Sequence, residues 1–256
     1  MRKISLVLLA LIGITVHAGE HNTQQKKCLV NAYSPYIKNV DGQIETRQGS
    51  ILVWSDNRNK SFKQKLNSPD ILDTLSQDYP LLKPISYRPS YNHDPGRFRY
   101  DPLLKAVYGG TPKEVTKNLI SIPWLPYSNI RSVRFNRQNG AAKALRKVVT
   151  DLKQLPKKYH KYLKNIGGTY NYRKIAGTNS LSPHSYGIAI DLNTRYSDYW
   201  RYSPKSLTAK TIRYKNSIPQ TIVDIFEKNG FVWGGRWYHY DTMHFEYRPE
   251  IINCSR

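Results

Sequence analysis

The sequence predicts an α+β fold. Two segments, 139–155 and 218–230, carry apolar residues at the spacing of a helix with one buried face. Two shorter segments, 188–193 and 243–247, alternate apolar and polar residues as half-buried strands do. We therefore expect helices and short strands to lie together in the C-terminal half of the chain.

Each predicted helix has recognisable end signals. Asn139 precedes the apolar pattern of the first helix, where it is expected to act as the cap. The second helix starts at Pro219 and stops at Gly230, residues that suit the first turn and the C-terminal end of a helix. A shorter helix over 111–120 opens with Thr-Pro-Lys-Glu, which has the spacing of a capping box.

The two predicted strands direct polar residues to one face. The first places Asp191 opposite its Ile and Leu residues, and the second places His244 and Glu246 opposite Phe245. Each strand therefore offers a potential metal ligand on the face away from its main apolar side chains.

The rest of the chain gives weaker signals. We expect strands over 51–54 and 128–136 and a short helix within 68–80. The stretch after Pro80, which ends in DPGR at 94–97, is rich in Pro, Tyr, Asn and Arg. We therefore interpret 19–110 as a loop-rich N-terminal extension that wraps the C-terminal part, 111–256.

The net charge predicts a polyanionic partner. The chain has 256 residues with 40 Lys and Arg against 18 Asp and Glu, a formal charge of +22, and its composition excludes collagen, coiled-coil and multi-span membrane proteins. Between Arg131 and Lys164 there are 11 Lys or Arg and one acid, Asp151. This stretch is either a solvated helix face or a polyanion-binding surface.

The N-terminus is typical of a cleaved secretory signal over 1–18. Arg2 and Lys3 precede an uncharged apolar run over 4–16 that is too short to span a bilayer comfortably, and Ala18 suits the cleavage site. The alternative is an uncleaved anchor. We expect an exported protein, either periplasmic or secreted.

The only two cysteines, Cys28 and Cys254, lie near opposite ends of the mature chain. In an oxidising compartment such a pair predicts one disulfide, worth roughly 4 to 5 kcal/mol in the chain-entropy model. Two free thiols are the alternative.

A possible metal site combines His184, Asp191 and His244. His184 and Asp191 are separated by six residues, and His244 follows Asp191 by 53. Two imidazoles and a carboxylate leave a fourth zinc position open, as in catalytic sites. Asp241, three residues before His244, is placed to act as a general base.

The surroundings of these residues resemble a known family. The segment GTYNYRKIAGTNSLSPHSYGIAIDLN, followed by a Trp-rich turn and DTMHFEY, resembles the zinc peptidases of the D-alanyl-D-alanine carboxypeptidase (VanY-type) and L-alanyl-D-glutamate endopeptidase group over roughly 115–250. The specific matching positions are Ser182, Pro183, His184, Gly187, Ala189, Asp191, Asp241 and His244.

The resemblance implies a role for each site residue. The three ligands would hold Zn²⁺ in a cleft on a small antiparallel sheet with packed helices, the LAS/hedgehog-like metallopeptidase fold. Asp241 would be the general base and then the acid, and Ser182 would hydrogen-bond the substrate. Arg173 would polarise the scissile carbonyl, a role that suits a permanently charged guanidinium; its alternative is a surface salt bridge.

Other side chains near these motifs have less defined roles. Four aromatic residues in the insertion after Asp191 would line a substrate groove or form a small satellite core: Tyr196, Tyr199, Trp200 and Tyr202. His239 is expected to support the site rather than bind the metal.

The predicted reaction is zinc-dependent hydrolysis of a peptide bond in peptidoglycan stem peptides, by a monomer without a nucleotide cofactor. Anionic cell-envelope polymers would attract its charge, whereas nucleic acid is not expected as the main partner of an exported protein. The alternative function is a noncatalytic module that binds the cell wall or another polyanion and keeps zinc for structure. Whether the enzyme is a carboxypeptidase or an endopeptidase stays open.

Overall fold

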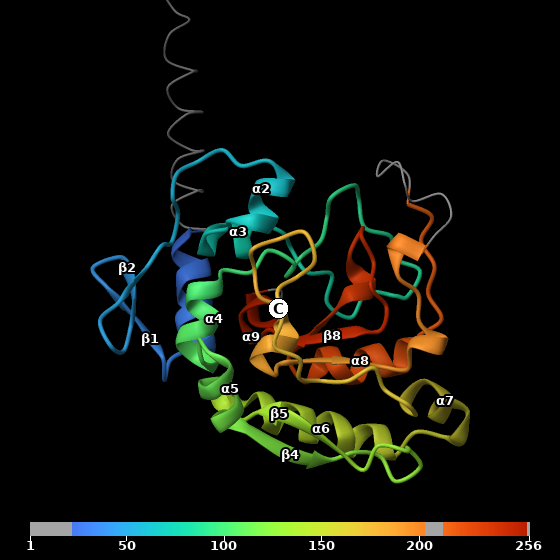
Figure 1. The fold of residues 1–256 in the computed structure, drawn as a ribbon. Coiled ribbons are helices and arrows are strands. Elements are labelled where there is room, and N and C mark those ends of the chain that lie inside the picture. The colour runs from blue at the N-terminus through green and yellow to red at the C-terminus, as the bar shows by residue number, and fades with distance from the viewer. Residues whose placement is uncertain (1–21, 203–211, 255–256) are drawn as a thin grey trace, which may run out of the picture.

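The computed structural model describes residues 22–202 and 212–254, and it is a mixture of helices and small antiparallel sheets, as an α+β fold requires (Figure 1). The predicted signal segment, 1–18, lies outside the described residues. Among the residues that are described, no helix combines the length and the apolar character needed to cross a membrane.

The central sheet carries the residues of the predicted metal site. It consists of β6 (Ala189–Asp191), β8 (His244–Tyr247) and β7 (Phe231–Trp233) in that spatial order, and both pairings are antiparallel. Helix α8 (Gln220–Lys228) covers one face, where the ring of Phe226 stacks on Phe245 at 4.0 Å between centroids. The opposite face of β6 and β8 is left for polar side chains.

A second layer consists of a hairpin and the long basic helix. Strands β4 (Leu119–Pro123) and β5 (Ser132–Asn136) pair, and α6 (Ala141–Lys153) packs between them and α8 (Figure 1). The predicted strand over 128–136 thus forms only in its second half, because 126–129 make the hairpin turn.

The helix ends follow the sequence signals with one exception. α5 (Pro112–Asn118) begins with the full Thr111–Glu114 capping box, and α8 begins directly after Pro219. Asn139, however, is not the cap of α6: it adopts a left-handed conformation in a short turn, and its amide donates to the carbonyl of Ala32. A long-range bond to the N-terminal part therefore replaces the expected local one.

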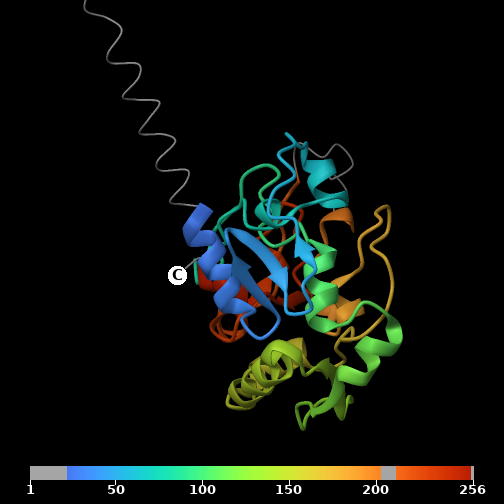
Figure 2. The same cartoon turned by 90° about the vertical axis from the view of Figure 1, so that its left-hand side faces the viewer.

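The N-terminal part contains more regular structure than its composition indicates. A helix over 22–32 lies beside the β1–β2 hairpin, as Figure 2 shows. Its remaining elements are β1 (Ile37–Val40), β2 (Gln43–Thr46), β3 (Ile51–Leu52), α2 (Phe62–Asn67), α3 (Ile71–Thr74) and α4 (Asp101–Tyr108). Short helices α7 (His160–Leu163) and α9 (Pro249–Cys254), with 3-10 turns Gln138–Gly140, Lys157–Tyr159, Pro183–Tyr186, Thr194–Tyr196, Trp200–Tyr202 and Gly234–Arg236, complete the described chain.

One hydrophobic core runs through both halves of the described chain, from Leu29 to Ile252. Buried polar contacts join the halves as well. Three buried glutamates of the C-terminal half each bond to an N-terminal side chain: Glu250 to Tyr33 at 2.7 Å, Glu227 to Tyr79 at 2.7 Å, and Glu246 to Arg99 at 2.7 Å. The proposed boundary near 110 is therefore not a gap in the core.

The two cysteines are free thiols in the structure, but their side chains lie in contact, Cys28 on the 22–32 helix and Cys254 at the end of α9. Burial and the neighbouring Cys28 thiol raise the pKa of Cys254. This proximity is what a disulfide between the two ends would require, and the bond itself stays a prediction.

Candidate metal centre

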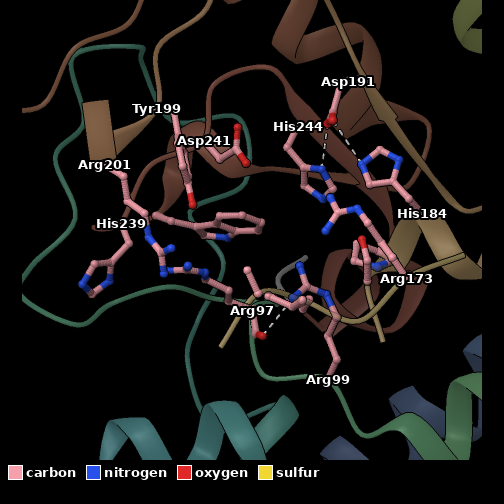
Figure 3. Close-up of a pocket in the computed structure, with 15 residues that line it drawn as sticks. Arg97, Arg99, Arg173, His184, Asp191, Tyr199, Arg201, His239, Asp241 and His244 are labelled. Carbon is pink, nitrogen blue, oxygen red and sulfur yellow. Dashed lines mark hydrogen bonds and ion pairs between the residues drawn. The ribbon is translucent and has the colours of Figure 1, made fainter. Parts of the chain in front are cut away.

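The structure brings His184, Asp191 and His244 together. One potential ligand atom from each residue lies within 4.8 Å of the others. His184 Nε2 is 3.2 Å from Asp191 Oδ2, and His244 Nδ1 is 3.0 Å from Asp191 Oδ1. Figure 3 shows both imidazoles turned toward the Asp191 carboxylate.

Local structure explains this convergence. Asp191 is directly opposite His244 in the β6–β8 pairing, so the two side chains project from the same face of the sheet. His184 lies in a 3-10 turn that ends at Gly187, whose φ of 66° is costly for residues with a Cβ. A Cβ at Gly187 would also clash with the side chain of Leu119. The turn thereby returns the chain into β6 with His184 beside the sheet.

Hydrogen bonds fix which imidazole nitrogen faces the cluster. His184 Nδ1 donates to the carbonyl of Thr169 at 2.8 Å, which leaves Nε2 as the nitrogen that faces Asp191 and that a metal would use. In His244 the nitrogens are used the other way round: Nδ1 faces Asp191, and Nε2 is 3.5 Å from Glu246 Oε2. The His184 ring is therefore held by a hydrogen bond outside the cluster, whereas His244 Nε2 lies near Glu246 without a hydrogen-bond partner among the described residues.

The electrostatics of the cluster favour a bound cation. Burial acts to raise the pKa of Asp191, but the hydrogen bonds and charges of His184 and His244 outweigh it and hold that pKa well below its usual range. Burial acts to lower the pKa of His244, but the Asp191 and Glu246 carboxylates raise it to about 9. The site thus stabilises positive charge next to an ionised carboxylate.

The donor set fits a divalent metal such as zinc. Tetrahedral zinc with bonds of about 2.0 to 2.2 Å requires ligand atoms about 3.3 Å apart. Each imidazole nitrogen lies near that distance from one Asp191 oxygen, 3.2 Å from Oδ2 for His184 and 3.0 Å from Oδ1 for His244, and one ligand atom from each residue lies within 4.8 Å of the others. Three ligands facing a pocket leave a position for water or substrate, as a catalytic site requires.

Asp241 lies in the same pocket as the three ligands. Its backbone is fixed by a hydrogen bond from its N–H to the carbonyl of Gly234 at 3.0 Å, and its Oδ1 is buried without a hydrogen-bond partner among the described residues. Burial raises the pKa of Asp241 to about 6, although the positive charge of His244 opposes the shift. A buried carboxylate with a free oxygen can exchange a proton near neutral pH.

Arg173 and Ser182 also line this pocket. The backbone of Arg173 is tied to the His184 turn, because its carbonyl accepts hydrogen bonds from the Ser182 N–H at 2.9 Å and the Ser185 hydroxyl at 2.7 Å. Figure 3 shows the Arg173 guanidinium beside His184 and His244. No ion pair to Arg173 is found among the described residues, so the alternative of a surface salt bridge has no support there.

The insertion after Asp191 was expected to line a groove with four aromatic residues, and one of them, Tyr199, lines this pocket. Tyr199 and Arg201 line it, whereas Tyr196 and Trp200 do not. The ring of Tyr196 packs on Tyr162, and Trp200 packs behind the pocket against His239, at 4.8 Å between centroids. A β-bridge between Tyr199 and Asp241 determines which side chains of the insertion face the pocket. The alternation of residues in the sequence could not predict this bridge.

Three further pocket residues come from outside the recognised motifs. Arg97 and Arg99 belong to the loop between α3 and α4, and His239 precedes β8. The Asp94 carboxylate binds His239 through both its N–H at 3.0 Å and its Nδ1 at 2.7 Å, which gives His239 the supporting role predicted for it. The charged residues of DPGRFR, 94–99, are evident in the sequence, but the sequence does not indicate that Asp94 binds His239 or that Arg99 binds Glu246.

Comparison with protein families gives one match. The family model described as D-alanyl-D-alanine carboxypeptidase matches residues 176–247. The matched segment contains the three clustered ligands and Asp241, but Arg173 and the arginines of the N-terminal loop lie outside it. The searches of curated proteins and of solved structures returned no match. The family match supports, at a coarse level, a metallopeptidase-type enzyme related to these carboxypeptidases and a substrate related to peptidoglycan.

Proposed function

We propose that this protein is a zinc-dependent peptidase that hydrolyses a peptide bond in peptidoglycan stem peptides. The observation that carries the proposal is the clustering of His184, Asp191 and His244 in a pocket that also contains Asp241. A purely structural zinc site would have four protein ligands and no need of a carboxylate beside it. The family match over 176–247 supports the substrate class.

The residues of the pocket divide the work of hydrolysis. His184 would hold zinc through Nε2, His244 through Nδ1 and Asp191 through its carboxylate; when bound, zinc supplies Lewis-acid activation of water and of the scissile carbonyl. Asp241 accepts a proton from the attacking water and then delivers it to the leaving amine. Arg173 stabilises the negative charge that develops on the carbonyl oxygen.

The decisive experiment incubates the purified protein with muropeptides, with and without a chelator, and restores zinc afterwards. We expect cleavage that disappears with the chelator and returns with zinc, and mass spectrometry of the products identifies the bond. The candidates are the D-Ala-D-Ala bond, the bond that an L,D-carboxypeptidase cleaves, and the L-Ala-D-Glu bond. No metal-dependent cleavage of any stem peptide would sink the proposal.

Asp241→Asn separates catalysis from binding. The amide cannot act as a base, so turnover should be lost while zinc content, measured by metal analysis, stays at the wild-type level. A noncatalytic wall-binding module with a structural zinc predicts instead that this substitution changes nothing measurable. The same comparison therefore decides between the two functions.

We also propose that the protein is exported and that it works as a monomer. The signal-like segment over 1–18 supports export, and the contact between the Cys28 and Cys254 thiols supports a disulfide formed in an oxidising compartment. Fractionation of cells tests export, thiol labelling of the mature protein tests the disulfide, and size-exclusion chromatography of the purified protein tests the monomer.

A further inference from the structure

The pocket contains more positive charge than the proposed hydrolysis uses. Four arginines line it, together with only two carboxylates, Asp191 and Asp241. Arg173 has the role of stabilising the carbonyl oxygen. The charge of Arg99 is matched by a bidentate bond to the buried Glu246. Arg97 and Arg201 therefore remain without a function in the reaction.

Arg201 is an exposed cation at the edge of the pocket. It belongs to the 3-10 turn Trp200–Tyr202, and its guanidinium lies 5.3 Å from the ring centre of Trp200. Among residues 22–202 and 212–254 no carboxylate forms an ion pair with it. A guanidinium stacked on an aromatic ring keeps its edge N–H groups available for an anion.

Arg97 is only partly neutralised. Its Nη1 is 2.8 Å from Asp94 Oδ2, but the same oxygen also accepts from His239 Nδ1 at 2.7 Å. One buried carboxylate thus serves two donors, while the Arg97 side chain is 18% exposed and lines the pocket. Asp94 fixes the orientation of Arg97 without using all of its hydrogen-bonding capacity.

Tyr199 lies between these two arginines and Asp241. Burial raises the pKa of Tyr199, the positive charges of Arg201 and Arg97 oppose the shift, and the negative charge of Asp241 adds to it. All three charged groups are therefore close enough to act on the phenol. In Figure 3, Tyr199, Arg97 and Arg201 lie on the Asp241 side of the pocket, away from Arg173 and His184.

We propose that Arg97, Arg201 and Tyr199 form a carboxylate-binding subsite, and that it selects substrates with a free carboxylate close to the scissile bond. Two guanidinium groups and a phenol offer a fork of N–H and O–H donors that suits a planar carboxylate. The inference rests on the proposed peptidase function. It adds a specificity determinant that lies partly outside the matched segment, since Arg97 comes from the N-terminal half.

Stem peptides offer this carboxylate from two sources, the free C-terminus of the leaving residue and an acidic side group next to the cleaved bond. Two matched pairs of peptides distinguish them: one pair differs by a C-terminal acid or amide, and the other by an acidic residue or its amide. We expect amidation of the carboxylate that binds the subsite to lower kcat/KM about 10- to 100-fold, as for loss of a charge-assisted hydrogen bond. Amidation of the other carboxylate should have little effect.

Substitution of Arg201 links the preference to the subsite. Arg201→Gln should raise KM with little change in kcat for the acid peptide, and it should shrink the acid-to-amide ratio toward 1. Arg97→Lys, which keeps the charge beside Asp94, should reduce the ratio in part. Arg195→Gln is the matched control, because Arg195 is an exposed arginine of the same insertion that does not line the pocket.

Two outcomes overturn the inference: equal cleavage of acid and amide peptides by the wild type, or an unchanged ratio in Arg201→Gln. Calorimetric binding of the same peptides to the zinc-loaded Asp241→Asn protein provides a readout that needs no turnover. If no peptide is cleaved but the acid form binds more tightly and Arg201→Gln abolishes the difference, the subsite stands and the proposed hydrolysis fails. Equal binding of both forms removes the subsite.

Discussion

Arg99 and Glu246 form a buried ion pair that connects the N-terminal half to the strand carrying His244. Both Glu246 oxygens accept from Arg99, Oε1 from Nε at 2.9 Å and Oε2 from Nη2 at 2.7 Å. Glu246 also contacts Arg248 at 3.2 Å and His244 Nε2 at 3.5 Å. Its ionised state is favoured, because the arginines hold its pKa well below the usual range despite burial.

Breaking this pair should unfold the protein more easily. Glu246→Gln removes the negative charge between two buried guanidinium groups, so we expect a loss of about 3 to 5 kcal/mol in unfolding free energy, measured by urea denaturation. The control is Glu45→Gln, which breaks a partly exposed pair with Lys38 and should cost under about 1 kcal/mol. Equal losses in the two variants would contradict the role of Glu246.

Metal binding should stabilise the folded chain. A ligand that binds only the native state at 100 times its Kd adds about 2.7 kcal/mol, so zinc should raise Tm and a chelator should lower it to the metal-free value. His184→Ala should abolish this response, and His160→Ala, outside the site, should keep it. If His184→Ala still shows the full rise in Tm with zinc, the metal binds elsewhere.

Peptidase activity should fall in acid because Asp241 must be ionised to act as a base. Its pKa is raised to about 6, so the ionised fraction is nearly complete at pH 7.5 and decreases as pH falls through that value. A bound dication would stabilise the carboxylate, which makes 6 the upper limit for the midpoint. Initial rates between pH 4 and pH 8 test this at constant zinc. Rates that rise from pH 7 to pH 5 would argue against Asp241 as the base.

The basic surface formed by the Lys and Arg residues of 131–164 should bind anionic wall polymers. No described ion pair involves a residue of 131–164, and Lys143 and Lys147 of α6 line a second pocket with Lys228 of α8. Replacing these three lysines with Gln should reduce cosedimentation with anionic wall material several-fold at low salt and leave cleavage of a short soluble peptide unchanged. The effect should vanish in 1 M salt, where screening acts over about 3 Å.

A matched triple variant controls for net charge. Lys63, Lys113 and Lys117 are exposed lysines away from that pocket, so their replacement with Gln removes the same charge from another surface. Equal loss of wall binding in the two triple variants would show that only total charge matters.

The features that the sequence predicted well depend on neighbours along the chain. The capping box at Thr111 and the helix that follows Pro219 form as expected, because their stabilising groups lie within one turn. The alternation that placed Asp191 and His244 on the polar side of their strands is also local, and the pairing of the strands then brings them together. The alternation did not predict which residues of the two strands would be directly opposite each other, but the observed register keeps the polar residues of both strands on one face.

The features that were missed depend on contacts between distant segments. Asn139 bonds to Ala32 instead of capping α6. Of the aromatic residues expected at the groove, Tyr199 reaches the pocket, where it pairs with Asp241, and Trp200 does not. Arg99 pairs with Glu246, 147 positions away, and Asp94, which holds Arg97, binds His239, 145 positions away; the local sequence of their loop reveals neither contact. The sequence therefore indicated the three clustered residues and Arg173, and only the fold revealed the other arginines of the pocket, Arg97, Arg99 and Arg201.

The three links between N-terminal side chains and buried glutamates make the peptidase-like part dependent on the rest of the chain. A shortened protein that began near residue 111 would lose Tyr33, Tyr79 and Arg99, and with them the partners of Glu250, Glu227 and Glu246. A buried carboxylate without a partner is costly, so the shortened chain would tend to aggregate or unfold. Moving the peptidase-like segment into another protein would therefore require the N-terminal side chains that these three glutamates bind, or substitutes for them.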